Sequence, residues 1–230
     1  VMNTDNMSIL GETFDFGPFG FLDDYDPGFI CNHSDHGGRY AFNNQPSIGL
    51  WNCHALAAAL KDHIDIERAK EIINDYQKNF YDELSTIFRK KLGLTTHESD
   101  DLSLAEELLS WMQKKKIDYT FAFRNLSKDP SFLYTDQAGK IWYEKYQKRL
   151  NKETTSPIER KRIMESTNPK FILRNYLAHE AIKDAEKSNF HKLNNLLEVL
   201  KNPFQENSKL EELAKPPPEW GKKLEISCSS

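Results

Sequence analysis

The chain has 230 residues, 38% hydrophobic and 29% charged, with a formal net charge of -4 at pH 7. This length suggests one large domain or two small ones, with enough chain to bury a core without disulfide bonds. Three cysteines exclude a disulfide-rich secreted scaffold, and no apolar run is long enough to span a membrane. The slightly acidic balance does not favour nucleic-acid binding. We therefore expect neither a membrane nor a nucleic-acid partner.

The first zone, residues 1–47, contains more than half of the glycines and is rich in Asp, Phe and Asn. Helical periodicity is weak here, and the aromatic residues argue against disorder. We predict short strands and structured loops. Because Val1 leads directly into a dense polar motif, we also expect the chain to have been cut inside a domain.

The second zone, residues 48–201, has the spacing of helices. An apolar run from Ala69 to Phe88 recurs at steps of three and four residues and ends at Gly93. Trp142, Tyr143 and Tyr146 also have helical spacing, which favours the core over an exposed stacking surface.

Two cap patterns predict helix starts in this zone. Ser103 followed by Glu106 has the spacing of a capping box. Asn168 followed by Pro169 predicts a helix with Asn as its cap and Pro in its first turn.

The third zone, residues 202–230, is predicted to be a tail. Three consecutive prolines, Pro216 to Pro218, favour an extended form. The tail ends in Ser227-Cys228-Ser229-Ser230.

The chemistry is concentrated in the first zone. Asp5 and Asn6 precede an apolar stretch, and Asp15 follows within Asp-Phe-Gly. Phosphoryl-transfer sites of the kinase type use an Asp as base and hard oxygen ligands for Mg²⁺. Asp-Phe-Gly alone is a weak motif, because Asp, Asn and Gly are also ordinary turn formers. The adjacent Asp5 and Asn6 also depart from the His-Arg-Asp pattern of protein kinases.

Other reactive side chains have simpler interpretations. Cys53 lies in an apolar helical stretch and is expected to be buried. His33, Asp35 and His36 could suggest a metal site, but no further ligand at suitable spacing is evident. Hydrogen bonds that order this loop are therefore favoured over a metal site.

Several blocks together carry a resemblance to a known family. The chain closely resembles selenoprotein O, the YdiU/UPF0061 family, at Val1 to Ile9, Asp15 to Asp23, Cys31 to Asp35, Arg39-Tyr40, Asn44 to Pro46, Asp118 to Thr120, Phe123 to Ser127, Asn168 to Ala178 and Ser227 to Ser230.

The resemblance implies a mainly α, protein-kinase-like C-lobe, with a catalytic loop and activation segment followed by a helical bundle. It implies a pseudokinase-like protein adenylyltransferase that binds ATP in a flipped orientation. AMP then passes to Ser, Thr or Tyr hydroxyls of protein substrates. By position, Asp5 corresponds to the catalytic base. Asn6 and Asp15 correspond to the ligands of Mg²⁺ or Mn²⁺, and Asp15 thereby to ATP binding.

The resemblance also implies regulation and an incomplete site. Cys31 and Cys228 resemble a redox-sensitive pair, with Cys228 at the position of the family's selenocysteine; two ordinary thiols are the alternative. The nucleotide-binding N-lobe, a partner of this segment, is expected to be missing, so the fragment alone is predicted to be inactive. A non-catalytic helical interaction module is the alternative function. We expect a bacterial cytoplasmic location, with mitochondria as the alternative.

Overall fold

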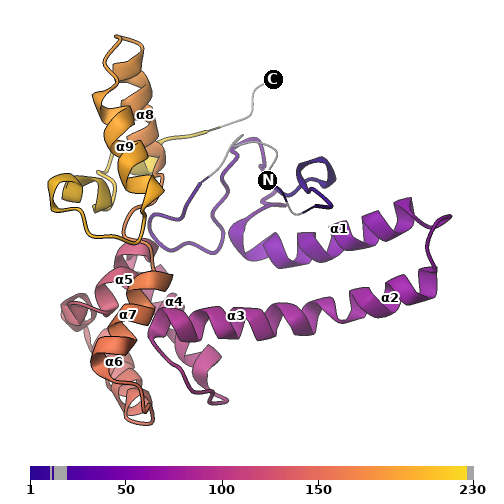
Figure 1. The fold of residues 1–230 in the computed structure, drawn as a ribbon, viewed down its shortest axis with the longest axis horizontal. Coiled ribbons are helices and arrows are strands. Elements are labelled where there is room, and N and C mark those ends of the chain that lie inside the picture. The colour runs from indigo at the N-terminus through magenta and orange to yellow at the C-terminus, as the bar shows by residue number, and fades with distance from the viewer. Residues whose placement is uncertain (11, 13–19, 227–230) are drawn as a thin grey trace. The chain divides into compact units, whose positions relative to one another are not determined.

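The computed structural model describes residues 1–10, 12 and 20–226. These residues are mainly helical (Figure 1), which confirms the predicted mainly α class. Over this part of the chain there is no strand, only an isolated antiparallel bridge between Asp24 and Asp118. The short strands predicted for residues 1–47 are therefore wrong wherever that zone is described. Asp and Asn side chains there bond to nearby backbone amides and compete with strand pairing.

Nine α-helices and five short 3-10 helices occur in the described ranges. In chain order they are η1 (Thr4–Asn6), η2 (Phe42–Asn44), α1 (Gln45–Ala59), α2 (Ile66–Asn74), α3 (Tyr76–Leu92), α4 (Asp101–Lys115), α5 (Tyr119–Leu126), η3 (Pro130–Thr135), α6 (Gln137–Leu150), α7 (Pro157–Thr167), α8 (Asn175–Ala185), α9 (His191–Lys201), η4 (Ser208–Ala214) and η5 (Gly221–Lys223).

The chain forms two compact units. Unit 1 comprises the described residues of 1–19, 26–84 and 225–230, and unit 2 comprises residues 20–25 and 85–224. Helix α3 begins in unit 1 and ends in unit 2.

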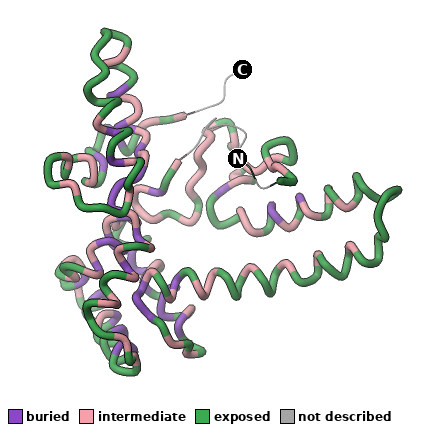
Figure 2. The backbone as a smooth tube through the Cα atoms, viewed as in Figure 1, coloured by how far each residue is buried: buried purple, intermediate pink, exposed green. Residues whose placement is uncertain are grey.

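Unit 1 contains η1, η2, α1, α2 and the first half of α3. Helix α1 contacts α2 after the turn that joins them. Asp65 ends this turn, and its side chain caps α2 by accepting hydrogen bonds from the backbone amides of Glu67 and Arg68. Few residues of these helices are buried (Figure 2).

Unit 2 carries most of the buried core. Trp142 and Tyr146 are buried, as predicted, whereas Tyr143 is only partly buried. The rings of Trp142 and Tyr146 stack with their centroids 5.2 Å apart. The indole of Trp142 donates to Leu104 O at 2.8 Å, and the hydroxyl of Tyr146 donates to Leu92 O at 2.7 Å. These bonds satisfy the polar atoms of two buried aromatic side chains and join α6 to α4 and to the end of α3.

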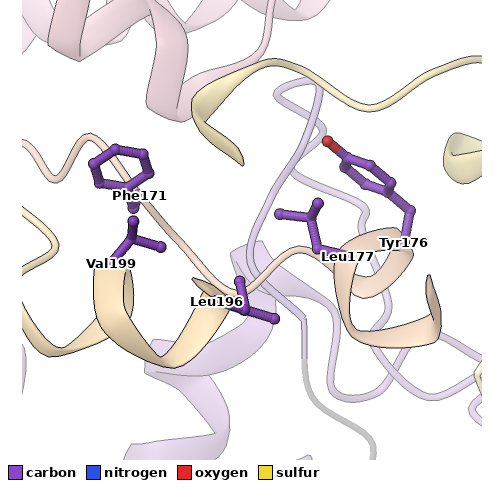
Figure 3. Close-up of a cluster of buried hydrophobic side chains, with 5 residues drawn as sticks. All are labelled: Phe171, Tyr176, Leu177, Leu196 and Val199. Carbon is purple, nitrogen blue, oxygen red and sulfur yellow. The ribbon is translucent and has the colours of Figure 1, made fainter. Parts of the chain in front are cut away.

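A second hydrophobic cluster joins α8, α9 and the tail. Its buried side chains are Phe171, Tyr176, Leu177, Leu196 and Val199 (Figure 3). Leu210, Leu213 and Leu224 of the tail pack against it. The tail includes η4 and η5 on either side of the three prolines, so it is not extended throughout.

Two predicted helix starts are wrong, and one predicted end is confirmed. Ser103 lies inside α4, which begins at Asp101. Asn168 follows the end of α7 instead of starting a helix, because its side chain donates to Lys91 O at 2.9 Å and accepts from the Lys91 ammonium. Helix α3 ends before Gly93, which has a φ of 70° that few residues other than glycine adopt.

Among the described helices, none is both long enough and apolar enough to cross a membrane.

Candidate functional site

The candidate catalytic residues Asp5 and Asn6 lie together in the 3-10 turn η1. The turn is closed by a backbone hydrogen bond from Asn6 N to Asn3 O at 3.0 Å. Both side chains are exposed. The side-chain amide nitrogen of Asn6 donates to Val1 O at 3.0 Å. The side-chain carbonyl oxygen of Asn6 takes no part in this bond. A carboxylate and a carboxamide are therefore both exposed on one short turn.

These two side chains fit part of a Mg²⁺ site in their chemistry, because Mg²⁺ prefers hard oxygen ligands. The third candidate, Asp15, lies outside the described residues. In the described part of the chain, no group of three His, Cys, Asp or Glu side chains is close enough to hold a metal ion. The structure thus shows Asp5 and Asn6 exposed on one turn, and a metal site formed by Asn6 and Asp15 stays a prediction.

Helix α1 supports the segment that carries η1. Asn52 is buried, and its side-chain amide donates to Met2 O at 2.9 Å. Gly49, one turn earlier, allows Tyr76 and Met2 to approach the helix, since a Cβ atom there would lie 2.4 Å from the Tyr76 hydroxyl. That hydroxyl donates to Pro46 O at 3.0 Å. The site segment is therefore anchored to α1 by a buried amide and close packing.

One buried atom beside this segment lacks a partner. Asn52 Oδ1 accepts no hydrogen bond from any described residue. Leaving a buried acceptor without a hydrogen bond costs free energy. The described residues therefore do not supply a donor that Asn52 Oδ1 would be expected to have.

The loop at residues 26–44 is ordered by hydrogen bonds, as predicted, with bonds to Asp35 and His33; whether His36 takes part stays a prediction. The Asp35 carboxylate accepts from Arg39 N at 2.9 Å and Tyr40 N at 2.8 Å. These bonds fix a turn of the loop. The favoured interpretation of Asp35 as a loop-ordering residue is confirmed.

His33 contacts the C-terminal tail within unit 1. Its backbone amide donates to Ile226 O at 2.9 Å, and Ile226 N donates to its ring Nδ1 at 3.2 Å. Cys31 is half-buried, and its sulfur lies 3.8 Å from Val1 N. Cys228 lies outside the described residues. The pairing of Cys31 with Cys228 therefore stays a prediction. The tail residue Ile226 bonds to His33, which follows Cys31 by two residues in the sequence.

The prediction that Cys53 is buried is wrong. It is half-buried and lines an apolar groove whose other walls are residues of α2 and α3.

A buried ion cluster in unit 2 holds residues 20–25. Arg174 is 2% exposed and donates to both carboxylate oxygens of Asp118, at 2.7 and 3.1 Å. It also forms an ion pair with Asp23. Burial raises the pKa of Asp23, although Arg174 acts in the opposite direction. The Lys222 ammonium adds an ion pair with Asp24 at 2.7 Å.

Sequence reasoning did not assign a role to Asp23, Asp118 or Arg174. The available signal was that all three lie in the blocks that resemble the family. A buried arginine needs carboxylate partners, but only the fold shows which carboxylates reach it. Their role is structural: the ion pairs of Arg174 hold residues 20–25 against unit 2.

A family model described as "Protein adenylyltransferase SelO" matches residues 1–201. The chain is 49% identical over 240 residues to a protein of Pseudomonas fluorescens (strain SBW25) named "Protein nucleotidyltransferase YdiU". A protein of the same name from Aliivibrio salmonicida (strain LFI1238) is 47% identical over 238 residues. Each comparison covers 100% of this chain and 49% of the relative. The chain thus spans about half the length of the curated relatives it matches.

Proposed function

The chain belongs to the SelO family, and from that membership we propose that the full-length protein containing it is a protein adenylyltransferase. It uses ATP as the AMP donor and Ser, Thr or Tyr hydroxyls of other proteins as acceptors. The observation that carries the proposal is the family match together with Asp5 and Asn6, which are both exposed on η1. The segment takes the place of a kinase-like C-lobe, and the N-lobe lies in the part of the family protein that this chain does not span.

In the proposed reaction, the acceptor hydroxyl attacks the α-phosphorus of ATP. A new phosphorus–oxygen bond forms to the acceptor, and the bond to the leaving pyrophosphate breaks. Asp5 accepts the proton of the hydroxyl, which is a task for an exposed carboxylate within reach of the acceptor. The Asn6 carbonyl oxygen and Asp15 would hold Mg²⁺ or Mn²⁺, and the metal ion would supply positive charge that neutralises the phosphates.

The proposal includes regulation and location. Cys31 and Cys228 form a redox-sensitive pair that tethers the tail to the loop at residues 26–44. The curated relatives come from bacteria, and we propose a cytoplasmic location. The 230-residue chain by itself is proposed to be inactive, because most of the nucleotide pocket lies outside it.

The test uses the full-length protein with ATP labelled at either the α- or the γ-phosphate. Transfer of the α-label to a protein acceptor, dependent on Mg²⁺, is expected. Asp5→Asn should remove most of this transfer, whereas Asp82→Asn, at an exposed position on α3, should leave it unchanged.

Two other results would contradict the proposal. Transfer of the γ-label would indicate ordinary phosphoryl transfer. Absence of Mg²⁺-dependent nucleotide binding and of both labels would support the non-catalytic interaction module instead.

A further inference from the structure

An apolar groove of about 650 Å³ lies within unit 1, along α1, α2 and the start of α3. Side chains from all three helices line it, among them Cys53, Leu56, Leu60, Ile72 and Tyr76. Helix α1 runs alongside α2, and α3 continues from α2 in nearly the same direction (Figure 1). The groove has no established role in nucleotide transfer.

Helix α1 has the composition of a core helix and the exposure of a surface helix. Its sequence, QPSIGLWNCHALAAA, contains no charged residue apart from a titratable His and is apolar on nearly every side. A helix of this kind is normally buried all round. Here only Ile48, Gly49 and Asn52 are buried (Figure 2).

The groove walls expose large apolar side chains to an unusual degree. Leu56 is 42% exposed, Leu60 is 39% exposed and Ile72 is 60% exposed. Scattered apolar residues on a surface need no explanation, but a contiguous concave patch marks a site that another surface covers.

The comparisons bear on what covers it. This chain matches 49% of the length of the relatives, so about half of each relative lies outside the matched part. A core-like helix requires permanent cover, and a segment of the same polypeptide is present at high effective concentration. A transient partner or a second copy would leave α1 exposed for part of the time.

We propose that this groove is the docking site for an amphipathic helix from the part of the SelO polypeptide that this chain does not span. The helix inserts apolar side chains at three- and four-residue spacing between α1 and α2. Glu83 and Asn79 form the polar edge of the groove, so the helix places a Lys or Arg beside Glu83. The proposal concerns packing and does not depend on the reaction that the protein catalyses.

Cys53 provides a direct probe of this cover. A maleimide is applied to the native 230-residue chain and to the native full-length protein, and labelling is followed by mass spectrometry of the peptide that contains Cys53. Labelling should be at least about tenfold slower in the full-length monomer, because a covered thiol reacts only through local opening. Equal rates in the two proteins would overturn the proposal. Protection of the 230-residue chain that grows with its own concentration would show a second copy as the occupant, which also overturns it.

A pair of matched variants gives an independent readout. Ile72 and Ile182 are 60% and 59% exposed, and each lies near the end of its helix. Ile72→Lys should lower the melting temperature of the full-length protein by at least about 3 °C, because it places a charge in the covered groove. The same change should shift the melting temperature of the 230-residue chain by less than about 1 °C. Ile182→Lys should also shift the melting temperature of either protein by less than about 1 °C. Equal small shifts for Ile72→Lys in both proteins would contradict the docking site.

Discussion

Arg174 and Asp118 form a buried, two-pronged ion pair that joins the start of α8 to the start of α5. Both residues are almost inaccessible, at 2% and 3% exposure, and two nitrogens of the guanidinium reach two carboxylate oxygens. Asp23 shares the same guanidinium. The chain segment at residues 20–25 is therefore fixed by charge as well as by the backbone bond from Tyr119 N to Asp23 O at 2.8 Å.

Removing the arginine should destabilise unit 2 strongly. Arg174→Met leaves Asp118 as an uncompensated buried charge, and the expected loss is about 3–5 kcal/mol of unfolding free energy. Denaturant-induced unfolding measures it. Lys192→Met, which breaks a solvent-exposed ion pair with Glu180, serves as the control and should change stability little. A similar small loss for both variants would show that the buried pair is not important.

The contribution of Glu153 should depend on pH in a defined window. Burial raises its pKa, but hydrogen bonds from Thr95, Thr96 and Arg149 outweigh burial and lower the pKa to about 2, from a usual value of 4.5. A carboxyl group whose pKa is lower in the folded state stabilises the protein above its unfolded pKa and loses this effect as the pH falls. Glu153→Gln should therefore be destabilising at pH 7, and the difference should shrink between about pH 5 and pH 2. Unfolding curves across this range test it; a constant difference would contradict the assignment.

Gly139 should not tolerate a side chain. A Cβ atom there would lie 2.1 Å from Leu133 O and 3.1 Å from a ring carbon of Trp111. Backbone cannot yield as a flexible side chain can, so Gly139→Ala should cost about 2 kcal/mol or more. Gly37→Ala is the matched control, because no atom lies within 4 Å of its Cβ position. Thermal unfolding of both variants checks the contrast, and equal stability would refute the close approach.

Asn52 should affect the proposed reaction without touching the substrate. Asn52→Ala removes the hydrogen bond to Met2 O and loosens the segment that carries Asp5 and Asn6. AMP transfer by the full-length protein should fall roughly tenfold or more, because small displacements of catalytic groups are costly. Asn194→Ala, at an exposed position on α9, should leave transfer unchanged. Wild-type rates in the Asn52 variant would show that α1 does not position the turn.

The redox pair can be tested by mapping disulfides in the oxidised full-length protein. His33 and Ile226 are paired by hydrogen bonds. Cys31 precedes His33 by two residues and Cys228 follows Ile226 by two, so both cysteines are close in sequence to these hydrogen bonds. A Cys31–Cys228 crosslink is therefore expected, and Cys31→Ser should abolish it. Crosslinks from Cys31 to Cys53, or none, would remove the proposed pair.

The sequence by itself determined the mainly helical class, the end of α3 at Gly93 and the burial of Trp142 and Tyr146. These features depend on local properties, namely apolar spacing and the backbone freedom of glycine. It also determined the family, through the blocks that contain Asp5, Asn6 and Asp15, and the loop-ordering role of Asp35.

Only the tertiary structure decided which distant residues meet. Asn168 looked like a helix cap, but its amide bonds to Lys91, which is far away in the sequence. Arg174 received no role from the sequence, but it is buried and paired with Asp23 and Asp118. Cys53 looked like a core thiol, but it lines an open groove. In each case the outcome depends on packing and charge pairing between segments brought together by folding, which local sequence patterns do not encode.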